Sequence, residues 1–448
     1  MMRTIIIIIL MITSPITCFT QTEKMTIERA ISIALQQNLD IKEMNRRLSS
    51  SKYEKWASIS NGFLPKVDLV QSYTRIDSDT YKRANASVDL IEEQIPPGMD
   101  VEIEPFAFKE KYSTWIQVSQ PIFNGSSIGA FNLSKALKSQ TEASYEELKL
   151  EIIYAVKNIY YNLLRGLNTV EILEEKVKAT NEHLNKIERM MDVGVASRSD
   201  LVRWKLQLAK DEGDLTTAKV AVENLKKKFN NLLDLPLESE FEFIEGDLEG
   251  FLEKIKEEVR GDYFDEPNQN HPILLQKKFS IDRSKASRFM AMSGFMPSVN
   301  FSFNYGWRED DDLEPDDYKQ WNLGLMFNFP LFHSGKNYFK YKSSDELYEL
   351  SKIEYNKTYE KIKLDNYTAN LKLEEEYAQI EISERRVDEA NENMKVISKK
   401  YDVGVASNLD YIDASVELTY AKLNKINALY SFLIALAEKE KIQGNISY

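Results

Sequence analysis

The chain has 448 residues, 29% of them charged, with a formal net charge of −13 and a single cysteine. This length allows one large domain or two to three ordinary ones. The acidic balance argues against a nucleic-acid partner, because phosphate binding needs a basic surface, and one cysteine cannot form a disulfide within the chain.

Residues 1–20 have the pattern of an export signal. A short basic start precedes the apolar run Ile5–Ile12, and small residues suit cleavage after Thr20. The run is too short to span a bilayer, which needs about 20 apolar residues, and no later segment approaches that length. The alternative is that Cys18 is a lipid-anchored first residue, although the three residues before it are a poor lipoprotein lead-in. We therefore expect an exported chain without a membrane-spanning helix.

The same order of landmarks occurs twice along the chain. The hexapeptide Asp-Val-Gly-Val-Ala-Ser stands at Asp192–Ser197 and again at Asp402–Ser407, 210 positions later. Other matching landmarks are Asn38 with Asn270, Gly62–Val67 with Gly294–Val299, and Pro121–Phe123 with Pro330–Phe332. This pattern indicates an internal duplication. The mature chain divides into a first repeat (residues 21–235), a linker or side domain (236–270) and a second repeat (271–448).

Each repeat is predicted to begin with a helix and two strands. The first helix runs from Thr26 to about Ser60, and its counterpart opens at His271 and ends near Gly294. Strict alternation of apolar with small or polar residues predicts strands. They are expected at Val67–Tyr73, Tyr112–Ile122, Val299–Trp307 and Trp321–Phe329. Aromatic residues on one face and small polar residues on the other are typical of membrane-spanning β-strands.

A very long helix, a turn and a returning helix complete each repeat. Apolar residues at three/four spacing predict the long helices at about Ile128–Met191 and Lys336–Tyr401, each roughly 90 Å long. Helices of this length are supported by packing side by side in a coiled-coil array. The returning helices are expected to end near Leu233 and Ile442.

The repeated hexapeptide is predicted to form the turn between these helices. Gly194 and Gly404 supply the conformational freedom for a C-terminal cap. The returning helices then begin with two capping boxes. Their members are Ser197 with Asp200, and Ser407 with Asp410.

With these features the chain resembles the TolC-like outer membrane efflux protein family over its mature length. The motifs that carry the resemblance are the Leu64-Pro65 and Met296-Pro297 junctions, the two Val-Gly-Val-Ala-Ser turns, and the run Asn408–Ala414. The resemblance implies a mostly α protein with β-strands that forms a homotrimer in the bacterial outer membrane. Each subunit would give four strands to a twelve-stranded barrel in outer membrane lipid, and the helices would form a periplasmic tunnel closed at the hairpin tips. Four strands alone cannot close a barrel, so strands in lipid would require association.

The resemblance also suggests which residues act at the tunnel tip. Asp410 and Asp413 match positions that ring the narrow entrance, where a carboxylate ring would attract cations. Asp410 fits equally well as a helix cap, and Asp200 is interpreted as a cap alone. Tyr401 matches a position that helps to hold the tip closed. The family's basic partner is replaced by Ala406 here, so simple packing of Tyr401 is the alternative.

No catalytic or metal-binding pattern emerges from the sequence. The three histidines, His183, His271 and His333, are too scattered to give metal-ligand spacing. The acidic residues of the 308–319 loop lack the pattern of a dedicated calcium site. Nucleophile triads and glycine-rich phosphate loops are absent from the sequence. We therefore predict a protein that is not an enzyme and needs no cofactor.

The combined interpretation is a passive outer membrane exit duct. It would receive its cargo from an inner-membrane pump through a periplasmic adaptor, or membrane fusion protein, of a tripartite efflux or type I secretion system. The alternative is an exported coiled-coil scaffold without a conducting pore. The alternating aromatic strands disfavour the scaffold, because a spacer has no use for a membrane-tall apolar band.

Overall fold

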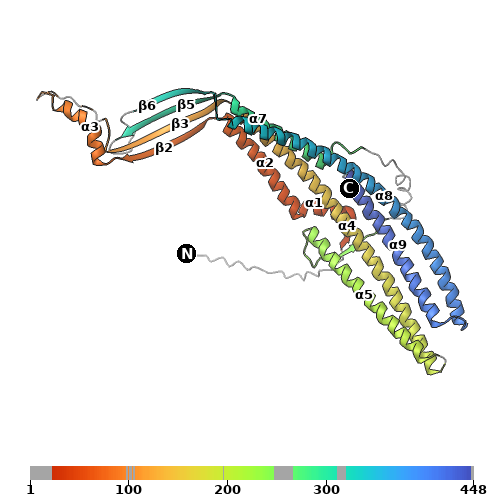
Figure 1. Ribbon diagram of the computed structural model, residues 1–448. Coiled ribbons are helices and arrows are strands. Elements are labelled where there is room, and N and C mark those ends of the chain that lie inside the picture. The colour runs from red at the N-terminus through yellow and green to blue at the C-terminus, as the bar shows by residue number, and fades with distance from the viewer. Residues whose placement is uncertain are drawn as a thin grey trace, which may run out of the picture.

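The computed structural model describes residues 23–96, 99, 103, 106–194, 196–246, 266–309 and 319–444. The expected signal with Cys18, the aspartates at 310–312 and 316–317, and positions 247–265 of the linker lie outside the described residues. The described chain is elongated. Its larger sheet lies near one end, and two helical hairpins reach the opposite end (Figure 1).

The helices and strands follow the two-repeat order. The first repeat contains β1 (Glu23–Met25), α1 (Ile27–Gln37), α2 (Leu39–Phe63), β2 (Lys66–Arg75), α3 (Ser78–Glu92), β3 (Glu110–Asn124), α4 (Gly125–Asp192) and α5 (Arg198–Leu232). The linker contributes β4 (Phe241–Phe243). The second repeat contains α7 (Pro272–Met292), a 3-10 turn (Ser293–Phe295), β5 (Ser298–Glu309), β6 (Gln320–Asn328), α8 (Lys336–Asp402) and α9 (Asn408–Gln443). The predicted strands, long helices and returning helices are all present.

The single helix predicted from Thr26 to Ser60 is wrong. The structure has two helices, α1 and α2, which are separated at Asn38, where the backbone is extended with ψ 134°. The Asn38 side chain caps α2 by accepting hydrogen bonds from the amides of Asp40 at 2.9 Å and Ile41 at 3.2 Å. The break therefore serves as a new helix start.

The segment between the first two strands of the larger sheet contains a helix. Helix α3 is capped by Asp77, whose side chain accepts hydrogen bonds from the amides of Asp79 and Thr80. The Asn85 side chain ties α3 to the returning chain through two hydrogen bonds with the backbone of Ala107, at 2.8 and 3.0 Å. This long connection is thus partly ordered by its own helix.

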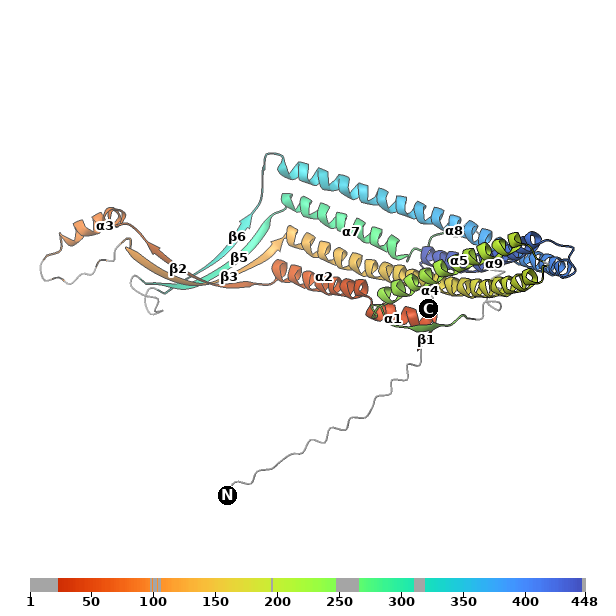
Figure 2. The ribbon, with the colours of Figure 1, turned by 90° about the horizontal axis from the view of Figure 1, so that it is seen from below.

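The two longest helices hold the molecule together along its length. Helix α4 has 68 residues and α8 has 67, so each extends roughly 100 Å. Near the larger sheet, neighbouring helices follow the order α2, α4, α7, α8 (Figure 2). Toward the tips the contacts run α5, α4, α9, α8. Within the described residues, no helix combines the length and apolar character that crossing a membrane requires.

The shorter helices meet end to end beside these long ones. The Asn38 side chain donates to the carbonyl of Leu232, 2.9 Å away, and so joins the start of α2 to the end of α5. In the second repeat, the His271 ring caps α7 and lies against Gly444, which ends α9 with φ +70°. A Cβ on Gly444 would lie 2.8 Å from His271 Cδ2, which is too close for any side chain. In both repeats, two half-length helices are therefore joined end to end in one line.

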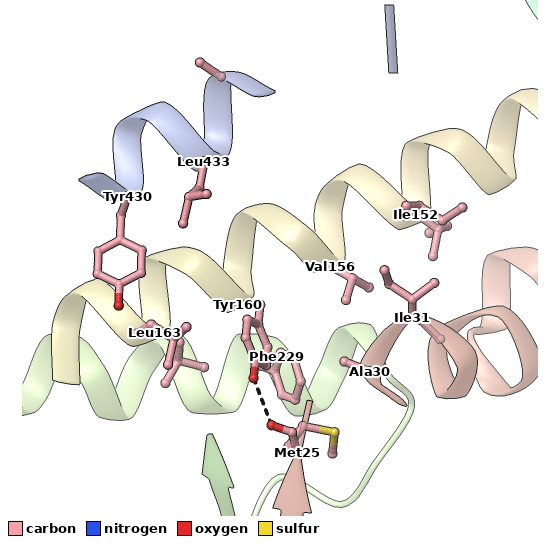
Figure 3. Close-up of a cluster of buried hydrophobic side chains, with 14 of the residues drawn as sticks. Met25, Ala30, Ile31, Ile152, Val156, Tyr160, Leu163, Phe229, Tyr430 and Leu433 are labelled. Atoms are coloured by element: carbon pink, nitrogen blue, oxygen red, sulfur yellow. Dashed lines mark hydrogen bonds between the residues drawn. The ribbon is translucent and has the colours of Figure 1, made fainter. Parts of the chain in front are cut away.

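The main core lies around these junctions. β1 and β4 form a small parallel sheet that packs against α4 and α5. The Tyr160 hydroxyl on α4 lies 2.9 Å from the Met25 carbonyl (Figure 3). It also lies 2.7 Å from the Ile244 carbonyl, and so joins the helix to the sheet. Phe229 of α5 and Leu433 of α9 are buried in the same cluster. The linker strand is thus part of the core.

The four-stranded antiparallel sheet has the order β2-β3-β5-β6. Its register sorts residues by chemistry across all four strands. One row is apolar and consists of Leu69, Ile116, Tyr305 and Trp321. The adjacent row is polar and consists of Asp68, Gln117, Asn304 and Asn322. Leu69 and Trp321 are 66% and 68% exposed in the single chain. The sheet therefore presents one apolar and one polar face.

Gly129 tests the close crossing of α4 and α7. A Cβ at this position would lie 2.3 Å from Met290 Cγ and 3.2 Å from Met290 Cα. We expect Gly129→Val to force the helices apart and destabilise the fold by about 1–3 kcal/mol. The matched control is Gly213→Val on α5, where nothing lies within 4 Å of the added Cβ. Thermal unfolding followed by circular dichroism should show a lower midpoint for Gly129→Val only, and equal midpoints would refute the crossing.

Candidate functional site at the hairpin tips

The glycines of the two repeated turns have nearly the same backbone conformation. Gly194 and Gly404 adopt left-handed φ angles of +78° and +76°. In the second turn the Val405 amide donates to the Lys400 carbonyl at 2.8 Å, and the Gly404 amide donates to the Tyr401 carbonyl at 3.0 Å. These two hydrogen bonds form the Schellman motif, which ends a helix when a residue such as glycine can adopt positive φ. The hexapeptide is therefore a helix stop.

Both returning helices start with a complete capping box. In the second, Asp410 Oδ2 accepts from the Ser407 amide at 2.8 Å, and the Asp410 amide donates to Ser407 Oγ at 3.2 Å. Ser197 and Asp200 repeat this arrangement in the first turn. Hydrogen bonds from Ser407 lower the pKa of the Asp410 carboxyl. Asp410 is consequently an exposed anion held in a defined position at neutral pH.

Asp413 lies three residues after Asp410 on α9 and is exposed. Three-residue spacing places the two side chains on neighbouring positions of one helical face. The corresponding positions of the first repeat hold Asp200 and Arg203. Asp200 caps its own helix in the same way, and hydrogen bonds from Ser197 lower the pKa of its carboxyl.

Five side chains from four helices join the two hairpins just behind the turns. This inter-hairpin cluster consists of His183 on α4, Trp204 on α5, Tyr401 on α8, and Asn408 and Tyr411 on α9. Trp204 Nε1 and the Tyr401 hydroxyl both donate to Asn408 Oδ1, at 3.1 and 2.7 Å. One amide oxygen therefore accepts a hydrogen bond from each hairpin.

Aromatic contacts close the rest of the inter-hairpin cluster. The His183 and Trp204 rings stack with centroids 5.1 Å apart and an interplanar angle of 7°. His183 Nε2 is hydrogen-bonded to the Tyr411 hydroxyl, and the two ring centroids are 4.1 Å apart. Trp204 is only 2% exposed and packs with Leu184 and Ile187 of its own hairpin. The hairpins are thus joined by a small core in which Trp204 is buried and the other four side chains are half-buried.

An ion pair continues this contact on the surface. Lys186 Nζ of α4 lies 3.1 Å from Asp402 Oδ1 of α8 and 5.4 Å from the centroid of the Tyr401 ring. Both charged side chains are substantially exposed, so the pair contributes no more than about 1 kcal/mol. The inter-hairpin cluster, which is more buried, is the stronger link.

The sequence identified the turns but missed most of this cluster. Tyr401 was predicted either to latch the tip or to pack, and the structure gives it a hydrogen bond to Asn408. His183, Trp204 and Tyr411 had not been expected to meet. The sign of the cluster in the sequence is that each of its residues differs from the residue 210 positions away in the other repeat. The second-repeat counterparts of His183 and Trp204 are Asn393 and Ala414, and the first-repeat counterparts of Tyr401, Asn408 and Tyr411 are Met191, Arg198 and Leu201.

A buried ion pair stabilises the first hairpin itself. Asp211 of α5 is fully buried and lies 3.2 Å from Lys176 Nζ of α4, while Thr180 donates to its other oxygen at 2.7 Å. Gln207 donates to the same carboxylate at 2.7 Å. Every polar atom of this kind needs a partner when buried, and these contacts favour one register of α4 against α5. Among the described residues, no three His, Cys, Asp or Glu side chains cluster as metal ligands would.

The sequence and the fold are similar to those of known outer membrane proteins. The family described as outer membrane efflux protein matches residues 30–226 and 265–445. The chain is 20% identical over 400 residues to the outer membrane protein TolC of Vibrio cholerae, across 88% of this chain and 85% of that protein. It is 22% identical over 379 residues to the probable efflux pump outer membrane protein TtgC of Pseudomonas putida, across 80% and 74%. The CmeC outer membrane channel of Campylobacter jejuni aligns with a TM-score of 0.77 and 18% identity, across 93% and 85%.

The chain belongs to the outer membrane efflux protein family. It is therefore an outer membrane protein of the efflux channel class, and this class is not one of enzymes. The predictions of family, location and channel function are confirmed, and the scaffold alternative is not supported. The fold of long helices with a four-stranded sheet also agrees with the solved channel.

Asn408 tests the link between the hairpins. Asn408→Ala removes the acceptor of two hydrogen bonds and leaves the Trp204 N–H buried without a partner, at a cost of about 1–3 kcal/mol. We expect backbone amides of both tips to exchange with solvent roughly tenfold faster, as measured by hydrogen-exchange mass spectrometry. Asn393→Ala, at an exposed position of α8, is the control and should leave exchange unchanged. Equal exchange in the two variants would contradict the role of Asn408.

Proposed function

We propose that three copies of this chain form one continuous duct, with a closed barrel in the outer membrane and a helical tunnel below it. The observation that carries the proposal is the incomplete sheet. Strands β2 and β6 are its two edges, and its apolar row is exposed. In lipid, unpaired edge groups cost several kcal/mol each. Pairing β2 of one subunit with β6 of the next closes the ring and satisfies both edges.

The helices at the sides of the same layer support this assembly. α2 lies on the β2 side of the described layer and α8 on the β6 side (Figure 2). Both expose large apolar side chains. On α2 these include Tyr53 and Trp56, and on α8 Ile353 and Leu364. A head-to-tail interface that repeats around a ring would cover both sets. The apolar row of the sheet would then face lipid and the polar row the lumen.

The tip turns would form the narrow end of the tunnel. In a trimer, Asp410 and Asp413 would give two rings of three carboxylates near the entrance. Such rings attract cations and repel anions at short range. The inter-hairpin cluster would hold each pair of hairpins together, and its loosening would widen the opening by an outward swing of the tips. The ends of these moving hairpins would be formed by the turn residues Gly194, Ser197, Asp200, Gly404 and Ser407.

The duct would be passive and would depend on partners for energy. We assign the tips as the docking point of a periplasmic adaptor, which couples the duct to an inner-membrane pump in a tripartite efflux or type I secretion system. The exposed valines of the turns, Val193, Val403 and Val405, offer apolar contacts at this end. Family membership and the position of the tips, far from the membrane sheet, support this assignment.

Trp56 tests the trimer and the complex together. Trp56→Asp would place a carboxylate where the subunit interface buries an aromatic ring, and an unpaired buried charge is strongly unfavourable. After cross-linking in cells and purification, we expect roughly tenfold less trimer and correspondingly less recovered adaptor and pump. Glu54→Lys lies about 200° away around the same helix and should retain both. A native protein that purifies as a monomer, or without any adaptor, would contradict the respective part of the proposal.

Ion selectivity tests the constriction. Asp410→Asn with Asp413→Asn should reduce the cation-to-anion permeability ratio in planar bilayers several-fold, because the local negative potential is removed. The control is Asp388→Asn with Glu389→Gln, which removes the same charge at exposed positions of α8 that lie farther from the tip turn. Unchanged selectivity in the first variant, or an equal loss in the control, would remove Asp410 and Asp413 from the constriction.

A further inference from the structure

His183 occupies an unusual position within the inter-hairpin cluster. Its ring is stacked on Trp204 of its own hairpin, while Nε2 is hydrogen-bonded to Tyr411 of the other. The second ring nitrogen, Nδ1, is buried and has no hydrogen-bond partner. A neutral ring tolerates this arrangement because one of its nitrogens can remain a bare lone pair. A protonated ring carries N–H on both nitrogens, so one donor would be buried without an acceptor.

The charges around His183 do not offset this cost. On its own helix, Lys186 disfavours the protonated ring and Glu182 favours it. Asp402 of α8 also favours protonation, but it is already paired with Lys186. From α5 the ring meets Trp204, and from α8 and α9 it meets Tyr401 and Tyr411, all neutral at physiological pH. Burial, with a smaller contribution from Lys186, therefore lowers the pKa of His183.

A cavity beside the ring provides a route to water. It has a volume of about 190 Å³ between the hairpins and is lined by His183, Trp204, Tyr411 and residues farther from the tip. The charged groups on its far side are engaged: Lys176 pairs with Asp211 and Lys422 with Glu175. A ring that leaves the inter-hairpin cluster can therefore be solvated without breaking these pairs.

We propose that His183 makes the hairpin link pH-sensitive: the neutral imidazole joins the two hairpins, and its protonation releases them and opens the tip in an acidic periplasm. Tyr411 is the partner that is released, and the stack on Trp204 is lost with it. This inference rests on the proposed tunnel, because it assigns a regulator to its narrow end.

The direction of the pH dependence follows from the two states. His183 has a lowered pKa in the linked state and an ordinary value of about 6.5 once released into water. The link is therefore fully stable above the ordinary pKa. As the pH falls below that value toward the lowered pKa, the equilibrium constant between the linked and the released state shifts toward release by at most about tenfold per pH unit.

Single-channel recordings of the full-length protein at pH 7.5 and 5.5 test this switch. We expect the native open probability to rise about three- to tenfold at pH 5.5. His183→Gln retains a group that can hydrogen-bond to Tyr411, and His183→Phe retains a ring on Trp204. Neither side chain titrates, so both variants should lose the response. His333→Gln, at an exposed histidine between β6 and α8, should keep it.

Spin labels give a second measurement that does not require conduction. Labels at Val193→Cys and Val403→Cys, with Cys18→Ser, report the separation of the two turns, and both valines are exposed. The separation should increase at pH 5.5 in native His183 and stay constant in His183→Phe. An equal response with and without His183, or no response at all, would overturn the switch. A protein that conducts no ions at either pH would instead overturn the proposed duct, whatever the spin labels show.

Discussion

Lateral support of two very long helices is the constraint on which the rest of this structure depends. A helix of 68 residues extends far beyond any globular core, so every turn of it needs a neighbour to cover its apolar stripe. Two returning helices cover only the half nearest the tips. The other half is covered by α2 and α7, and the junctions at Asn38 and His271 make each pair of half-length helices act as one support.

This arrangement explains why the linker strand β4 belongs to the core. The break between α5 and α2 would expose backbone groups and apolar side chains at the middle of the helical layer. Helix α1 and the β1–β4 sheet cover that break, and the Tyr160 hydroxyl fixes the sheet to α4. The middle of the molecule therefore holds the larger of the two buried clusters of the described residues.

The duplication provides a common scaffold on which the two tips diverge. Both turns use the same glycine and the same capping box because ending one helix and starting another poses the same local problem twice. The residues that join the hairpins differ from their repeat counterparts at every position of the inter-hairpin cluster. A contact between unlike partners, such as Trp204 with Asn408, needs a donor on one side and an acceptor on the other.

The sequence by itself determined the strands, the long helices and the turns, because each of these depends on neighbours within one or two turns of chain. Glycine conformation, capping boxes and apolar periodicity are all signals of this local kind. The helix break at Asn38 has a local part, the cap on the amides of Asp40 and Ile41. Its other part escaped prediction, because the carbonyl of Leu232 is 194 residues away. The inter-hairpin cluster escaped for the same reason, since His183 and Tyr411 are 228 residues apart. Only the tertiary structure brings them together, because hydrogen bonds and ring stacking act over a few ångströms in space and leave no periodic mark on the chain.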